Sequence, residues 1–212
     1  WGDRVWIIDP LDGTTNFTHG HPFFAVSVAL SEGKSLLAGV VHAPALGETY
    51  WARAGGGAFL NGDPIRVAAP TRLQESLLAT GFSYGRKEVG AGALERFGEL
   101  LLGAREIRRG GSASLDLAYT ASGTFSGFWE YHLKPHDVAA GALLVEEAGG
   151  IVTDVAGGRD FLLGGSIAAG NRAIHARLLE TLKKGPRHPG AAARVSPGAG
   201  GARPATAPRA GR

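Results

Sequence analysis

The chain has 212 residues, of which 44% are hydrophobic, with 34 glycines and no cysteine. This composition provides the core of one sizeable domain and excludes a disulfide framework, a thiolate nucleophile and a zinc–thiolate site. No apolar run approaches the roughly 18 residues that cross a bilayer, and no basic-then-apolar leader opens the sequence. We therefore expect a cytoplasmic protein with no membrane partner.

The formal net charge of +3 is unevenly distributed. Residues 185–212 carry five of the 22 basic residues and no acidic one, which leaves 17 basic against 19 acidic residues in 1–184. The tail is rich in Gly, Pro, Ala and Arg without periodicity, so it buries too little apolar surface to offset its ordering entropy. We predict a folded domain over 1–184 and a disordered basic tail over 185–212. A solvated tail is the simpler interpretation, and nucleic-acid binding through it is the alternative.

The first half of the chain alternates strand-like runs with tight turns. The turn at Asn61-Gly62 is the strongest, because Asn-Gly favours a two-residue hairpin. The link between Ser31 and Lys34 is also of hairpin length. The pattern predicts an antiparallel half over roughly 1–105. Its predicted strands are Val5–Ile8, Phe23–Leu30, Ser35–His42, Glu48–Arg53, Phe59–Leu60, Ile65–Val67 and Ser76–Thr80.

Helices then alternate with strands. The segment Glu88–Leu102 places its apolar residues on one helical face, and the segment Asp137–Ala148 is strongly helical and is followed by Gly149-Gly150. Two further helices are predicted at Ser112–Ala121 and Arg172–Lys184, and three strands at Thr124–Glu130, Ile151–Asp154 and Ser166–Ala169. This order predicts the α+β class, with an α/β half over roughly 106–184 after the antiparallel half.

The run from Asp9 to Phe17 (DPLDGTTNF) follows the first strand-like segment. Hard cations such as Mg²⁺ take oxygen ligands, which the carboxylates of Asp9 and Asp12 can provide. Gly13 and Thr14 would offer backbone N–H and hydroxyl donors to a phosphate beside the metal. A polar turn with solvated carboxylates explains the same residues. Because Asp-x-x-Asp-Gly is common in loops, the run alone does not decide between the two.

A second motif, Lys134-Pro135-His136-Asp137, opens the helix predicted near 137–148. Asp137 stands where an N-cap belongs, and a cap worth about 1 kcal/mol would account for it. A carboxylate at a helix start can also reach a metal across a cleft, and the small residues at 139–141 would let the helix approach closely.

The two motifs together resemble those of the inositol monophosphatase family, the Mg²⁺-dependent, lithium-sensitive sugar phosphatases. The run Asp9–Phe17 is followed about 120 residues later by His136-Asp137-Val-Ala-Ala-Gly141 and by Glu147-Ala-Gly-Gly150. The resemblance extends from about Val5 to Lys184. It implies the layered α/β sandwich of that family and a homodimer.

The resemblance also implies roles for individual residues. The metal ligands would be the side chains of Asp9, Asp12 and Asp137 and the backbone carbonyl of Leu11, and the catalytic residues would be Asp9, Asp12, Thr14 and Asp137. The substrate would be bound by Gly13, Thr14, Gly111, Ser112, Ala113, Glu130 and Asp137. A helix-opening turn explains Gly111–Ala113 equally well, and a solvated strand-end acid is the alternative for Glu130.

The activity implied is Mg²⁺-dependent hydrolysis of a sugar or polyol phosphomonoester by metal-activated water. Inositol 1-phosphate is the first expectation, because nucleotide bisphosphate and histidinol phosphatases more often carry a basic residue at the position of Thr15. Fructose 1,6-bisphosphate and nucleotide bisphosphates are alternative substrates. An RNA- or transcription-associated binding role with little catalysis is the alternative of another class, because bacterial relatives are implicated in such regulation.

The chain departs from the family pattern at two places. His136 replaces the usual tryptophan, where it could fill space, add a weak metal ligand or carry a proton. The family also has a Gly-Glu-Glu motif and a threonine upstream of the first aspartates, whereas this sequence opens at Trp1 without any methionine. We therefore expect an N-terminally truncated domain that lacks its first helices and strands and is catalytically impaired.

Overall fold

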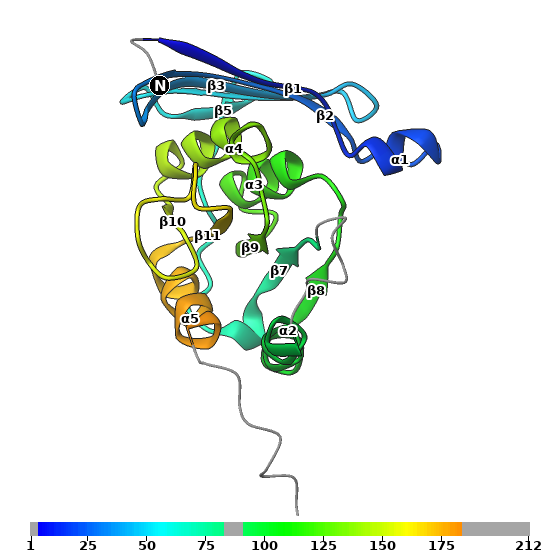
Figure 1. Cartoon of the computed structure of the whole chain (residues 1–212), viewed down its shortest axis with the longest axis vertical. Coiled ribbons are helices and arrows are strands. Elements are labelled where there is room, and N and C mark those ends of the chain that lie inside the picture. Colours follow the sequence, from blue (N-terminus) through cyan, green and yellow to red (C-terminus); the bar gives the residue numbers. More distant parts are fainter. Residues whose placement is uncertain (1–3, 83–90, 184–212) are drawn as a thin grey trace, which may run out of the picture.

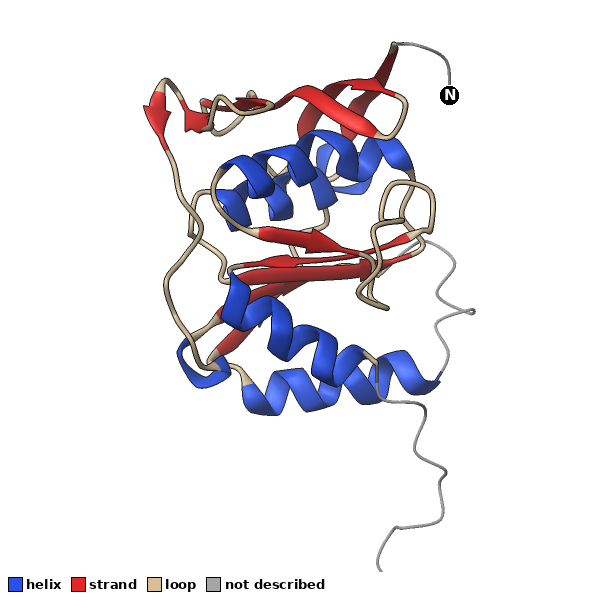
Figure 2. Ribbon diagram, turned by 90° about the vertical axis from the view of Figure 1, so that its left-hand side faces the viewer, coloured by secondary structure: helices blue, strands red, loops and turns tan. Residues whose placement is uncertain are grey.

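The computed structural model describes residues 4–82 and 91–183. Two sheets and two pairs of helices form successive layers, in the order sheet, helices, sheet, helices (Figures 1 and 2). The first sheet is an antiparallel meander in which each strand pairs with the next along the chain. Its strands are β1 (Val5–Asp12), β2 (Ala25–Glu32), β3 (Ser35–Ala43), β4 (Glu48–Arg53), β5 (Ala58–Leu60) and β6 (Asp63–Pro64).

The second sheet is mixed and has the order β10-β11-β9-β7-β8. Strand β7 runs parallel to both of its neighbours, whereas β11 pairs antiparallel with β9 and β10. Its strands are β7 (Leu77–Thr80), β8 (Glu106–Arg108), β9 (Gly127–Tyr131), β10 (Ile151–Thr153) and β11 (Ser166–Gly170). The chain therefore passes from the first sheet to the second before β7, whereas the expected antiparallel half extended to about residue 105.

The helices fill and cover these layers. Helices α3 (Ala113–Ala121) and α4 (Pro135–Glu147) pack against each other between the two sheets, while α2 (Ala91–Gly103) and α5 (Arg172–Leu182) cover the far face of the second sheet (Figure 2). A short helix α1 (Thr14–Thr18) and a 3₁₀ turn (Leu73–Glu75) complete the described elements. None of the described helices combines the length and the apolarity that crossing a bilayer requires.

Small residues let α4 approach the first sheet closely. Strand β2 alternates buried and less buried positions, and its inward-facing side chains are small, such as Ala25, Ser27 and Ala29. At Gly39 of β3, an added Cβ would lie only 3.0 Å from the Cα of Ala140. The helix that carries the second motif is therefore held against the sheet that carries the first, because close-packed interiors leave no room for movement between them.

The predicted α+β fold, with an antiparallel half and a layered α/β arrangement, is confirmed. Individual elements differ: α1 and β8 were not predicted, and residues 65–67 are not a strand. Strands β2 and β9 begin two or three residues later than expected. The first residues of the helix expected at Glu88–Leu102, and the tail over 185–212, lie outside the described residues.

Candidate active site

A cavity of about 350 Å³ lies where the ends of β1, β7 and β9 meet the starts of α3 and α4. Its lining combines segments that are distant in the sequence, and it includes every expected site residue except Ser112. The lining residues are Asp9, Leu11, Asp12, Gly13, Thr14, Thr15, Gly81, Phe82, Arg109, Gly111, Ala113, Glu130, His132, Leu133, Lys134, His136 and Asp137.

Asp9 and Asp12 reach the same face of β1 because the strand carries a bulge between them. Asp9 pairs with Ser27 of β2 and Asp12 pairs with Ala25, so three steps along β1 match two steps along β2. In a regular strand, side chains three residues apart would point to opposite faces. The extra residue of the bulge brings the side chains of Asp9 and Asp12 back to the same face. Their pairing partners on β2, Ser27 and Ala25, are both buried on the face towards α4. The two carboxylates are therefore directed inward rather than solvated.

The carboxylate of Asp9 lies beside the start of α4. An oxygen of Asp9, an oxygen of Asp137 and a ring nitrogen of His136 all lie within 4.8 Å of one another. Strand β1 and helix α4 thus bring the two motifs together in space. The Asp9 carboxylate also accepts a hydrogen bond from the backbone N–H of Leu11 at 3.0 Å. Two carboxylates at this spacing provide the oxygen donors that a divalent cation such as Mg²⁺ requires, so this donor set fits that ion.

Asp137 is not the N-cap of α4, as its sequence position had suggested. The helix begins at Pro135, so Asp137 is its third residue and Lys134 precedes the first turn. One oxygen of Asp137, Oδ2, accepts the backbone N–H of Lys134 at 2.6 Å. Burial raises the pKa of Asp137 and the charge of Asp9 adds to this rise, while the hydrogen bond from Lys134 opposes it. The other oxygen, Oδ1, lies 3.6 Å from Nε2 of His136.

Asp12 lies in the same lining but outside the close cluster of Asp9, His136 and Asp137. Its Oδ2 accepts three hydrogen bonds, from the hydroxyl of Ser112 at 2.7 Å, the hydroxyl of Ser114 at 2.6 Å and the backbone N–H of Ser114 at 2.8 Å. Burial raises the pKa of Asp12, and these bonds oppose the rise. The start of α3 thus holds one oxygen of Asp12 in place and leaves the other for a further contact.

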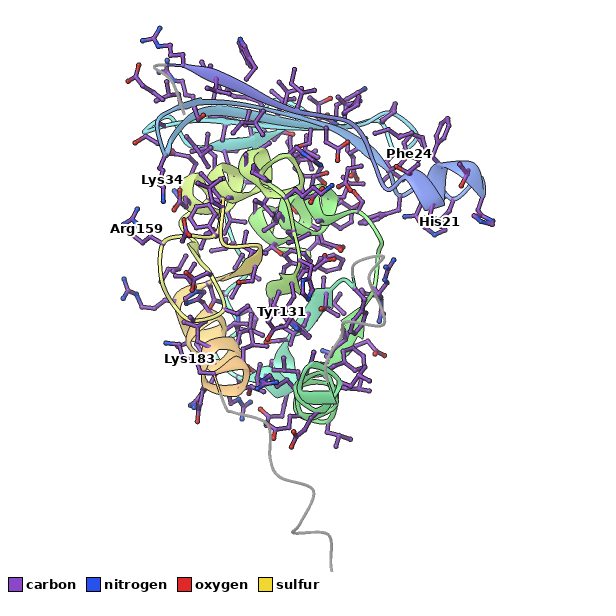
Figure 3. All side chains as sticks on the ribbon, viewed as in Figure 1. His21, Phe24, Lys34, Tyr131, Arg159 and Lys183 are labelled. Carbon is purple, nitrogen blue, oxygen red and sulfur yellow. The ribbon has the colours of Figure 1, made fainter. Side chains whose placement is uncertain are left out.

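The turn after β1 requires glycine at position 13. Gly13 has a φ of 84°, and an added Cβ would lie 2.9 Å from the carbonyl oxygen of Phe23. The Thr14 hydroxyl donates to the carbonyl of Leu11 at 3.0 Å, and that carbonyl retains a second lone pair. Helix α1 then projects from the body of the molecule, beside the labelled Phe24 and His21 (Figures 1 and 3).

Glu130 enters the cavity from the end of β9. It is only 8% exposed, and a Cβ on Gly81 would lie 2.0 Å from its carboxylate. Burial raises the pKa of Glu130 to about 8; Asp12 and Asp137 contribute to this rise, while Arg109 opposes it. Glycine at position 81 therefore makes the space that the Glu130 carboxylate occupies.

Asp116 of α3 is a further buried acid behind the lining. It is 1% exposed, and neither of its carboxylate oxygens has a hydrogen-bond partner among the described residues. Burial raises its pKa well above the usual value, and the charges of Glu130 and Asp12 add to the rise. A Cβ on Gly110 would lie 2.7 Å from its Oδ1.

The residues expected to bind substrate before α3 divide into two groups. Gly111 and Ala113 line the cavity, while the hydroxyl of Ser112 caps α3 and binds Asp12. The segment is fixed by Asn16, whose Nδ2 donates to the carbonyls of Phe23 at 2.7 Å and of Gly110 at 2.9 Å. The segment before α3 is therefore both a helix start and a wall of the cavity.

Sequence reasoning missed Ser114, Arg109, Asp116 and Gly81. The Ser-Ala-Ser spacing at a helix start was a signal for Ser114, because backbone and hydroxyl donors there can share one carboxylate. Arg109 lines the cavity and donates to the carbonyl of Phe82 at 3.1 Å. The roles of Asp116 and Gly81 depend on neighbours distant in the sequence, and no local pattern marks them.

The chain is similar to known proteins in both sequence and structure. The model of the inositol monophosphatase family matches residues 1–187. A Mesorhizobium japonicum protein named inositol-1-monophosphatase is 46% identical over 179 residues, covering 84% of this chain and 67% of its own. A Pseudomonas aeruginosa protein named Nus factor SuhB is 46% identical over 183 residues, covering 85% and 68%. The solved structure of an inositol monophosphatase from Anabaena superposes with a TM-score of 0.84 at 41% identity, covering 87% and 73%.

Proposed function

Because this chain belongs to the inositol monophosphatase family, a family of phosphomonoester hydrolases, we propose that it hydrolyses a sugar or polyol phosphate, with inositol 1-phosphate as its preferred substrate. The observation that carries this proposal is the approach of the Asp9 and Asp137 carboxylates from two adjacent layers of the fold, the first sheet and the helix layer packed against it. They meet at a cavity of about 350 Å³, a volume within the range of small-molecule sites.

The cation in this proposal is Mg²⁺, held by Asp9, Asp12, Asp137 and the carbonyl of Leu11. When bound, such an ion supplies a Lewis acid and lowers the pKa of a bound water. The carboxylates hold the cation beside the phosphate, and the bonds from Ser112 and Ser114 keep one oxygen of Asp12 from rotating away.

The remaining lining residues orient the substrate. The backbone N–H groups of Gly13 and Thr14 are donors for the phosphate, because N–H groups at the first turn of a helix have no intrahelical partner. Glu130, with Gly111 and Ala113 across the cavity, meets the ring hydroxyls. Because the pKa of Glu130 is raised to about 8, its carboxyl can donate a hydrogen bond as well as accept one in the absence of the cation.

The site is also compatible with two alternatives to inositol 1-phosphate hydrolysis, which the experiment below distinguishes. Fructose 1,6-bisphosphate and nucleotide bisphosphates are alternative substrates for the same donor set. A transcription-associated binding role is favoured by the relatives named Nus factor SuhB. A homodimer and a cytoplasmic location stay predictions, which light scattering and cell fractionation can check.

The test is phosphate release from inositol 1-phosphate by the purified protein, with and without Mg²⁺. Asp12→Asn should reduce turnover at least about 100-fold, because the neutral amide is a poor Mg²⁺ ligand. Asp63→Asn replaces an exposed acid on β6 that is not part of the lining; this matched control should turn over normally.

Undiminished turnover in Asp12→Asn would refute the role of that residue. Faster release from fructose 1,6-bisphosphate or a nucleotide bisphosphate would change the substrate and keep the chemistry. No hydrolysis of any of these esters, together with RNA retention that falls steeply with salt, would favour the binding role.

A further inference from the structure

The ring of His136 gives the lining of this cavity a nitrogen donor. This histidine is the second residue of α4, directly before Asp137. Adjacent side chains on a helix normally diverge, yet Nε2 of His136 lies 3.6 Å from Oδ1 of Asp137. An oxygen of Asp9, from strand β1 of the adjacent sheet, lies within 4.8 Å of both.

The spacing of these atoms suits ligands better than it suits a hydrogen bond. A separation of 3.6 Å is too long for an N–H···O bond. Two ligand atoms about 2.1 Å from one metal, at a tetrahedral angle, lie about 3.4 Å apart. The side chain of His136 is 39% exposed and that of Asp137 is 21% exposed, so both have room to rotate around an ion.

The ring of His136 is also free for this use. Among the described residues, the ring nitrogens of His136 make no hydrogen bond, and their ion-pair partner is Asp137. Its backbone is held in place, because the Ser27 hydroxyl donates to the His136 carbonyl at 3.4 Å. The backbone of His136 is thus fixed, while its imidazole is free to turn towards an ion.

Imidazole discriminates between metal ions. Mg²⁺ prefers oxygen ligands and retains its waters, whereas imidazole suits ions such as Co²⁺ and Zn²⁺. Two carboxylates and one imidazole therefore form a mixed set of ligands, in which the imidazole adds more to the affinity for a transition-metal ion than to the affinity for Mg²⁺. A tryptophan at this position would offer no lone pair to a metal.

We propose that His136, with Asp9 and Asp137, is a nitrogen ligand that raises the affinity of this site for transition-metal ions of the Zn²⁺ type relative to its affinity for Mg²⁺. This inference rests on the metal site of the proposed function and adds the selectivity of that site. Its consequence is that Zn²⁺ competes for the position of one Mg²⁺ in this chain more strongly than in a form without the imidazole.

The experiment measures Co²⁺ and Mg²⁺ binding by calorimetry, with the visible absorption of Co²⁺ as a direct report of its ligands. His136→Gln should weaken Co²⁺ binding at least about 10-fold and change the absorption, while Mg²⁺ affinity changes less than about threefold. His136→Cys should restore tight Co²⁺ binding, with a new sulfur-to-metal absorption band. His132→Asn, which alters another histidine of the same lining, should leave the Co²⁺-to-Mg²⁺ ratio unchanged.

A fourth variant, Asp9→Asn, separates the two proposals. It should weaken both ions, because Asp9 is a ligand in either case. An unchanged Co²⁺ affinity and spectrum in His136→Gln, with loss of binding in Asp9→Asn, would overturn the role of His136 and leave the metal site standing. Unchanged binding of both ions in Asp9→Asn would overturn the metal site itself. Circular dichroism of each variant checks that it is folded.

Discussion

Replacing Glu130 by glutamine should stabilise the chain near neutral pH. Glu130 is 8% exposed, and burial raises its pKa from 4.5 to about 8. The folded chain therefore keeps this proton at pH values where the unfolded chain has lost it. Its stability is greatest below about pH 4.5 and falls as the pH rises towards about 8, because ionisation favours the unfolded state in this window.

The magnitude follows from the separation of the two pKa values. A pH of 7 lies about 2.5 pH units above the unfolded pKa of 4.5, and each unit corresponds to about 1.4 kcal/mol. The buried carboxyl thus lowers the free energy of unfolding by about 3 kcal/mol at pH 7. Glutamine has nearly the same shape and no charge to desolvate. Glu130→Gln should therefore recover about 2–3 kcal/mol at pH 7 and almost nothing near pH 4.

Urea unfolding followed by circular dichroism, at several pH values from about 4 to about 8, measures this difference. A chelator should be present, because a bound cation would lower the pKa of Glu130. Glu180→Gln on the exposed side of α5, where Glu180 pairs with Arg177, is the matched control and should change stability by less than about 0.5 kcal/mol. A gain in Glu130→Gln that is equal at every pH, or a loss at pH 7, would refute the reasoning.

Two further predictions test packing and the support of Asp12. Gly39→Ala should lower the free energy of unfolding by about 1–3 kcal/mol, because its Cβ would lie 3.0 Å from Ala140. Gly98→Ala on α2, where an added Cβ would have no described atom within 4 Å apart from its chain neighbours and the backbone of its own helix, should raise that free energy by up to about 1 kcal/mol. Equal effects of the two changes in urea unfolding would contradict the packing argument. Ser114→Ala removes a 2.6 Å hydrogen bond to Asp12 and should weaken Mn²⁺ binding about 10-fold by calorimetry. An unchanged affinity would show that this support is not needed.

The elements that could be predicted are those whose pattern reflects one buried face. Strand β2 alternates in both sequence and burial, and α4 is an apolar run with small residues throughout. The sequence pattern did not predict the elements whose formation depends on tertiary contacts. Helix α1 has only five residues, none of them buried, so no periodicity could reveal it. Strand β8 has three residues and is held by its parallel pairing with β7.

Most of the predicted site residues line one cavity. They could be predicted because each of the two motifs places its carboxylates and hydrogen-bonding groups within a short stretch of sequence. The supporting contacts could not be predicted in the same way. The carboxylate of Asp12 is held by serines about a hundred positions later in the sequence. The pKa of Asp116 on α3 is raised in part by the charge of Glu130 on β9. Such contacts depend on how α3 docks, which no single segment encodes.

The bulge of β1 also determines which changes the first motif can tolerate. Pro10 and Leu11 have no partner in the register with β2, so their backbone groups are released from the ladder. Deleting one of them would still leave Asp9 and Asp12 on one face, but a regular ladder would engage the carbonyl that now faces Thr14. Exchanging the side chain of Leu11 would leave that carbonyl in place. At position 11 the fold thus requires that a residue be present between Asp9 and Asp12, and it does not require a particular side chain. Because the contribution of this position comes from its backbone carbonyl, the amino-acid type at position 11 does not reveal it.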